Sequence, residues 1–120
     1  MKIAACALIA VAVTIGAVHG QTPAPDPVKV AAGAALYTAQ KCGQCHMIKT
    51  VGGKLAGALD GIGTRRTAAE LKKWFSPTTA AELEAKLPKK PVVTMSGWLK
   101  THKLTDADID NLVAYMASLK

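Results

Sequence analysis

The chain has 120 residues, with 15 Lys and Arg against 8 Asp and Glu, a formal net charge of +7, and 50% hydrophobic residues. This length is enough for one domain and too short for two. Only five residues are aromatic (two Trp, two Tyr and one Phe), which argues against a nucleic-acid surface of interleaved basic and aromatic side chains. The same scarcity leaves a small domain short of large apolar groups to fill its centre.

Residues 1–20 predict a secretory signal peptide, because Lys2 is followed by an apolar run and by small residues at a cleavage position between Gly20 and Gln21. The apolar run is shorter than the roughly 20 residues that span a bilayer, so an uncleaved membrane anchor is the alternative. We therefore expect a periplasmic or otherwise exported protein that meets a membrane only if this segment is retained.

The folded domain is expected over residues 28–120, after a tether over residues 21–27 that contains three prolines. Asp26 is suited to cap a helix whose first position is Pro27, where the missing N–H costs nothing. Helix-tolerant residues then continue to Gln40, so the domain is predicted to begin with a helix.

Capping patterns predict three further helices. These are a helix from Thr67 to Ser76 with a capping box at Thr67 and Glu70, a short helix from a similar box at Thr79 and Glu82 that stops at Pro88, and a last helix capped by Thr105 and Asp108. Residues 52–63, which are rich in glycine, and residues 89–103 predict irregular segments. The apolar stripe of the last helix is Ile109, Leu112, Val113, Met116 and Leu119. No alternating strand pattern appears, so the predicted fold class is all-α.

Cys42-Gly43-Gln44-Cys45-His46 is the pattern by which c-type haem is attached covalently. In a helical turn, Cys42 and Cys45 lie on one face, so both thiols reach the two vinyl groups of one porphyrin. His46 follows directly under the ring, where two covalent links fix its imidazole relative to the iron. The motif predicts one covalent haem c per chain, with Cys42 and Cys45 as attachment sites and His46 as an iron ligand.

A zinc site and a redox-active disulfide are the other functions that a CxxC pair can serve. A structural zinc ion takes four ligands. Beyond the motif, His102 is the only further histidine or cysteine after residue 20, and no second CxxC is present. A thioredoxin-like disulfide belongs to a βαβ architecture, which the sequence does not predict. Haem attachment therefore remains the favoured interpretation.

The second axial position of the iron has four candidate ligands, namely Met47, Met95, Met116 and His102. Met47 adjoins His46 on the same side of the ring and does not reach the other face. Met116 belongs to an apolar helical stripe, where methionine more often fills a core. Met95 lies in a proline- and glycine-bearing segment far enough along the chain to cross to the opposite haem face, so we predict Met95 as the ligand. The alternative is His102, which would give a bis-histidine haem.

With these motifs in place, residues 28–120 resemble the class I cytochromes c. The haem motif lies near the start of the domain and the methionine near its end. Gly33 with Tyr37 resembles the glycine and aromatic residue of that family's first helix, and Leu112 with Tyr115 resembles their partner pair on the last helix. The resemblance implies a small cytochrome c fold of several short helices wrapped around one covalent haem, with the first and last helices crossing at Gly33.

The chain departs from that family's pattern at two places. The family often has Gly-Pro in the loop after the haem motif, where a carbonyl accepts from the second nitrogen of the histidine ligand, and this chain has Ala56-Gly57-Ala58. The family often follows its methionine with proline, and this chain has Ser96. Both departures concern groups that hold the axial ligands in place.

A haem bound by both His46 and Met95 has no open site for a substrate, which predicts a single-electron carrier and not an enzyme. The expected partners are a donor and an acceptor redox protein that dock transiently on a monomer. Six lysines either steer an acidic partner or serve solubility alone: Lys41, Lys49, Lys54, Lys89, Lys90 and Lys100. The alternatives are a peroxidase-like or gas-binding haem protein with a labile ligand, and a cytochrome subunit of a dehydrogenase complex.

Overall fold

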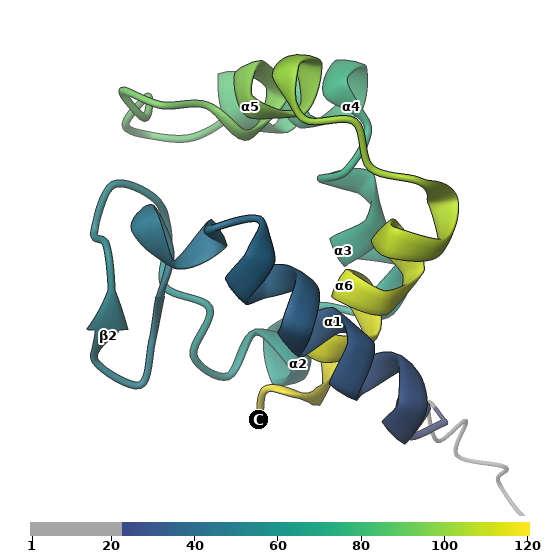
Figure 1. Cartoon of the computed structure of the whole chain (residues 1–120). Helices are drawn as coiled ribbons and strands as arrows, with labels where there is room; N and C mark the ends of the chain where they lie inside the picture. The colour runs from purple at the N-terminus through teal and green to yellow at the C-terminus, as the bar shows by residue number, and fades with distance from the viewer. Residues whose placement is uncertain (1–22) are drawn as a thin grey trace, which may run out of the picture.

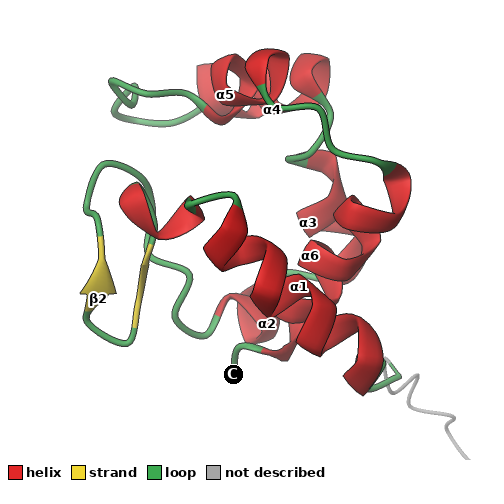
Figure 2. Ribbon diagram, viewed as in Figure 1, coloured by secondary structure: helices red, strands yellow, loops and turns green. Residues whose placement is uncertain are grey.

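The fold consists of short helices with one small β-hairpin, as Figures 1 and 2 show. The computed structural model describes residues 23–120, so the predicted signal peptide and the first two residues of the predicted tether lie outside it. The elements are helix α1 (Pro27–Ala39), a 3₁₀ turn η1 (Cys42–Gln44), strands β1 (Met47–Ile48) and β2 (Val51–Gly52), and helices α2 (Ile62–Arg65), α3 (Ala68–Lys73), α4 (Pro77–Ala85), α5 (Met95–Thr101) and α6 (Asp106–Ser118). Every helix within residues 23–120 is too short or too polar to cross a membrane.

Helix α1 begins where the sequence predicts it. The Asp26 side chain accepts a hydrogen bond from the Val28 N–H at 2.8 Å, and Pro27 occupies the first helical position. The helix ends at Ala39, and Lys41 then takes a left-handed backbone conformation with φ of 54°. This turn directs the chain from α1 straight into the haem motif.

Helices α1 and α6 cross with their backbones in close contact, as the resemblance implies. Gly33 is buried at the crossing, and a Cβ atom placed on it would overlap the Asn111 carbonyl and lie 2.7 Å from the Cβ of Tyr115. One turn further along α1, the rings of Tyr37 and Tyr115 meet edge to face, with centroids 5.7 Å apart and planes at 61°. The crossing therefore requires glycine at residue 33.

The core is a small apolar cluster that collects around α6. Helix α6 packs against α1, α2 and α3, whereas α4 and α5 pack on each other and form the uppermost layer in Figure 1. The buried apolar residues are Leu71, Phe75, Ala80, Leu99, Leu112, Val113 and Met116. The three buried residues of α6 belong to its predicted stripe, and Ile109 packs against the same cluster.

Two predicted capping boxes are confirmed. At the start of α3, the Thr67 side chain accepts from the Glu70 N–H, and the Glu70 carboxylate accepts from the Thr67 N–H at 2.7 Å. Thr105 and Asp108 form the same reciprocal pair at the start of α6. The bonds from the Thr67 and Thr105 N–H groups lower the pKa values of Glu70 and Asp108. These boxes satisfy N–H groups that the first turn of a helix leaves free.

Two predictions in the segment after α3 are wrong. The box at Thr79 and Glu82 does not form, because the N-cap is Ser76, three residues earlier, and Pro77 is the first residue of α4. The irregular structure expected over residues 89–103 also includes a helix, α5. Thr94 begins it by accepting from the Gly97 N–H at 3.1 Å, and packing against α4 supports a stretch whose glycine disfavours helix.

The all-α fold class is confirmed, with one small hairpin that the sequence does not predict, and the predicted loop over residues 52–63 needs correction. Strands β1 and β2 pair in antiparallel register, Met47 with Gly52 and Ile48 with Val51. The two turn residues between them, Lys49 and Thr50, have φ values of 48° and 67°, the conformation that a two-residue hairpin turn requires. The far end of the predicted loop is occupied by α2. These elements are too short to leave a periodic pattern in the sequence.

We predict that Gly33→Ala destabilises the fold by about 1–3 kcal/mol, because the added methyl group forces α1 away from Asn111 and Tyr115. Guanidinium unfolding of the holoprotein measures this change. Ala35→Gln is the control, an exposed change on the same helix, and its effect should remain within about 0.5 kcal/mol. Equal effects of the two substitutions would contradict the close crossing.

Candidate functional site

The haem motif forms a single tight turn at the end of α1. The N–H groups of Cys45 and His46 both donate to the Cys42 carbonyl, at 3.2 and 3.0 Å. This turn brings the two cysteines to one face, as the spacing predicts. Their thiols are half-buried and not joined in a disulfide, and burial raises the pKa of Cys42. Both sulfur atoms are therefore free to bond to a cofactor.

The chain after the hairpin packs against the back of this turn. The Gly53 N–H donates to the Gly43 carbonyl at 2.8 Å, and the Ala56 N–H donates to the Cys45 carbonyl at 3.0 Å. A Cβ on Gly53 would overlap the Gln44 carbonyl and lie 3.2 Å from the Cα of Cys45. Two segments of backbone thus meet closely, and their hydrogen bonds fix the shape of the motif.

The imidazole of His46 is oriented by a backbone carbonyl. Its Nδ1 lies 2.7 Å from the carbonyl oxygen of Gly57, and because that oxygen only accepts, Nδ1 carries the proton. The other nitrogen, Nε2, then has a free lone pair, which is the form that binds a metal. The Gly57 carbonyl therefore accepts the imidazole hydrogen bond for which the family often uses a Gly-Pro loop.

Tyr37 links the helix crossing to the haem motif. Its hydroxyl group donates to the His46 carbonyl at 3.0 Å, and its ring lies beside Gly43 and against Tyr115. Burial raises the pKa of Tyr37 from 10.0 to about 12, with smaller contributions from nearby acidic groups. A side chain of α1 thus holds the backbone of the predicted iron ligand.

Met95 is the first residue of α5 and comes from a different layer than the motif. It is half-buried and packs at the edge of the apolar core. In Figure 1, α5 lies in the upper layer with α4, and the motif lies in the segment between α1 and the hairpin below. Met95 and His46 therefore belong to separate parts of the fold.

The three other candidate ligands have structural roles. Met116 is 9% exposed within the core, and Met47 pairs with Gly52 in the hairpin. His102 lies at the far end of α5, stacked on Trp98 with ring centroids 4.1 Å apart and planes at 8°. Its Nδ1 lies 3.0 Å from the Trp98 carbonyl. Met116 is thus part of the core, Met47 belongs to the hairpin next to His46, and the His102 ring lies against Trp98.

The site suits a large apolar cofactor. Several large apolar side chains around the site remain exposed to solvent. Val51 and Leu55 beside the motif are 75% and 58% exposed, and Val92 and Val93 before Met95 are 94% and 45% exposed. Covering such side chains with a porphyrin removes apolar surface from water, which is worth about 25 cal/mol per Å².

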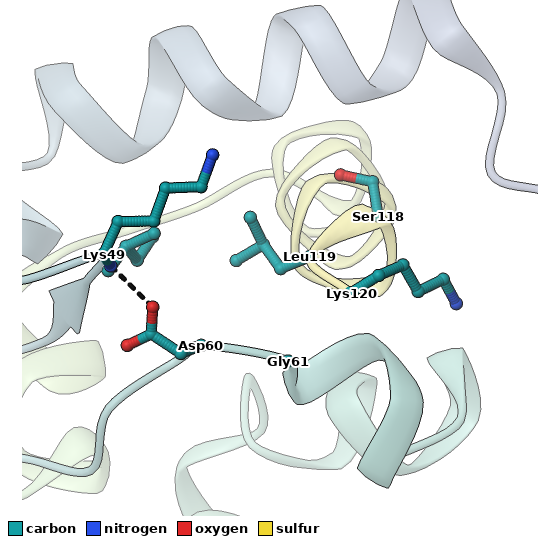
Figure 3. A pocket seen from close by; sticks show the side chains of 7 residues that line it. Lys49, Asp60, Gly61, Ser118, Leu119 and Lys120 are labelled. Atoms are coloured by element: carbon teal, nitrogen blue, oxygen red, sulfur yellow. Dashed lines mark hydrogen bonds between the residues drawn. The ribbon is translucent and has the colours of Figure 1, made fainter.

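Two surface depressions lie away from this site. One, of about 300 Å³, lies between the hairpin turn and the C-terminal residues, and it includes the 2.6 Å hydrogen bond from the Lys49 N–H to the Asp60 carboxylate that Figure 3 shows. The other, of about 320 Å³, lies where the segment after α3 meets the end of α5 and the start of α6, and it is lined in part by Phe75 and His102. Neither is lined by the motif cysteines, His46 or Met95.

A turn with two free thiols, followed by an imidazole whose Nε2 is available, is the donor set of a c-type haem protein. The comparison with family models agrees with this class, since the model described as Cytochrome c matches residues 30–120. The chain belongs to the cytochrome c family, which binds haem covalently and carries electrons. Searches of curated proteins and of solved structures found no match.

Sequence reasoning missed two groups that support the site. Asp60 accepts from the Lys49 N–H and so stabilises the hairpin turn that follows the haem motif. Glu84, a buried residue of α4, accepts two hydrogen bonds from Ser96. An aspartate in a glycine-rich loop is a weak sequence signal for the contact between Asp60 and Lys49. An acidic residue in a polar helix gives no sequence signal for the contact between Glu84 and Ser96.

We predict that Tyr37 makes unfolding stability fall as the pH rises from 10.0 to about 12. Over this interval the folded state keeps the proton of the Tyr37 phenol, whereas the unfolded chain releases it. The contribution of this proton to the unfolding free energy is therefore fully present below pH 10.0 and is lost as the pH rises through the folded-state pKa of about 12. The unfolding free energy of Tyr37→Phe should not show this part of the fall with pH. Unfolding curves of both proteins over this interval measure it, and a phenol that titrates near 10.0 in the absorbance difference would contradict it.

Proposed function

We propose that this cytochrome c is an exported single-electron carrier whose iron is ligated by His46 and Met95. The observation that carries the proposal is the bond between His46 Nδ1 and the Gly57 carbonyl, which leaves Nε2 free beside two unpaired thiols. Export is proposed from the signal-peptide pattern of residues 1–20.

Met95 is proposed as the second ligand because its position suits this role. Its helix and the haem motif belong to different layers, and its side chain remains half-buried at the edge of the core. Methionine and histidine together favour the reduced iron and raise the reduction potential. Occupation of both axial positions also leaves no coordination site for a substrate.

The chain's own residues attach, orient and shield the cofactor. Cys42 and Cys45 would hold the haem through two thioethers, each the addition of a cysteine S–H across a vinyl double bond, so that no atom would be lost. Gly57 and Tyr37 then hold His46 through its Nδ1 and its carbonyl oxygen. The haem supplies the one-electron couple when bound. Fixed ligands on both faces keep the rearrangement on electron transfer small.

Exposed lysines are proposed to guide a redox partner with an acidic surface. Lys49 and Lys54 come from the hairpin and the loop after it, and Lys89 and Lys90 come from the loop between α4 and α5. Both regions project to the left in Figure 1. Like charges gathered on one side raise the rate of encounter with an acidic partner, an effect that salt screens.

We predict that Met95→Ala abolishes the far-red charge-transfer band that a methionine–iron bond gives to an oxidised haem. The measurement is an absorption spectrum of holoprotein made in a host that attaches haem c. Met47→Leu and His102→Gln are the controls, and both should keep the band. A band that survives Met95→Ala would exclude this ligand, and a wild-type iron that binds peroxide or a diatomic gas would favour the peroxidase-like or gas-binding alternative.

We predict that the mature holoprotein has the mass of residues 21–120 plus one intact haem, because thioether formation adds the cofactor without loss of atoms. Mass spectrometry under denaturing conditions measures both attachment and cleavage. The double variant Cys42→Ala with Cys45→Ala should release its haem on denaturation. Wild-type protein with the mass of the bare chain would exclude covalent attachment, and retention of residues 1–20 would support a membrane anchor.

A further inference from the structure

We infer that Glu84 is a positioning residue for the iron ligand Met95, acting through two hydrogen bonds to Ser96. Glu84 lies in the last turn of α4, and Ser96 follows Met95 in the first turn of α5. The inference rests on the proposed ligation by Met95. It assigns to this chain's own residues the stiffness that the family often obtains from a proline after its methionine.

The contact is a buried, two-pronged bond. One carboxyl oxygen of Glu84 accepts from the Ser96 N–H at 3.0 Å, and the other accepts from the Ser96 hydroxyl group at 2.5 Å. Both residues are 7% exposed, the only buried polar residues within residues 23–120. Placing a carboxyl group there is favourable only because its oxygens have partners.

The bonds close the base of a loop that has little other support. Residues 88–93 make no hydrogen bond within the part of the chain that the structure describes, and most of their side chains are exposed. The Glu84–Ser96 pair spans this loop, and the Thr94 hydroxyl group fixes its end by accepting from the Gly97 N–H. Without Glu84, the start of α5 is fixed to α4 by apolar packing alone.

Fixing Ser96 also fixes Met95, because consecutive Cα atoms are held about 3.8 Å apart. A methionine sulfur is a weak ligand whose bond to iron persists when the protein presents it in the right place. Residues that orient a metal ligand typically contribute about 10–100-fold to metal affinity. The Glu84 bonds therefore resist the loop movement that would expose the iron to another ligand.

The test is titration of the oxidised holoprotein with imidazole, which has to displace Met95 in order to bind. Glu84→Ala should bind imidazole roughly 10-fold more tightly than wild type and show a weaker far-red band. Glu84→Gln should stay close to wild type, because its amide oxygen accepts from the Ser96 N–H and its amide nitrogen donates to the Ser96 hydroxyl group. Glu82→Ala, an exposed change on the same helix, should have no effect.

Leu71→Ala separates positioning from loss of stability. Leu71 is 4% exposed in α3, so its truncation should lower the unfolding free energy by about 2–5 kcal/mol while leaving imidazole affinity unchanged. The inference is overturned if folded Glu84→Ala has wild-type affinity, or if Leu71→Ala raises affinity as much as Glu84→Ala does. If Glu84→Ala does not hold haem, Ser96→Ala is tested in its place. The inference then requires that Ser96→Ala bind imidazole more tightly than wild type.

Failure of this inference differs from failure of the proposed ligation. If Met95→Ala leaves the spectrum and the imidazole affinity of wild type unchanged, Met95 is not the ligand, and both proposals fall. If Met95→Ala abolishes the far-red band while Glu84→Ala and Ser96→Ala behave as wild type, Met95 remains the ligand and Glu84 does not position it.

Discussion

The crossing of α1 and α6 at Gly33 is the contact on which the haem motif depends. Because residue 33 has no side chain, α1 lies against the backbone of α6, and Tyr37 meets Tyr115 one turn later. Tyr37 then donates to the His46 carbonyl, so the helix crossing helps to determine where the predicted histidine ligand lies. A wider crossing would move the end of α1 and the motif that follows it directly.

Local chemistry made much of this fold predictable. Asp26, Thr67 and Thr105 start α1, α3 and α6 as their capping patterns predict, since those signals involve only neighbouring residues. Helix α5 and the hairpin were missed because their formation depends on contacts from elsewhere in the chain. Helix α5 packs on α4, and the hairpin turn is supported by the distant Asp60 carboxylate. A two-residue strand is also too short for an alternating pattern.

The candidate site divides in the same way. The attachment motif can be recognised because its five residues are contiguous, whereas Met95 stays a prediction that rests on an unexplained methionine in a suitable segment. The groups that support them could not be predicted, since a backbone carbonyl such as that of Gly57 has no residue identity to recognise. Glu84 resembles any surface acid of a polar helix until the packing of α4 on α5 buries it.

The two faces of the proposed iron site are held by different means, and this difference determines which face yields first. His46 follows the two predicted attachment points and has hydrogen bonds at its Nδ1 and its carbonyl. Met95 follows an exposed loop and depends on the Thr94 cap and the Glu84–Ser96 bonds, which are noncovalent. Because local opening begins where backbone contacts are fewest, the methionine face is the one that opens while the rest of the fold stays intact. An electron carrier of this design keeps its cofactor through the histidine face and controls ligand exchange through the methionine face.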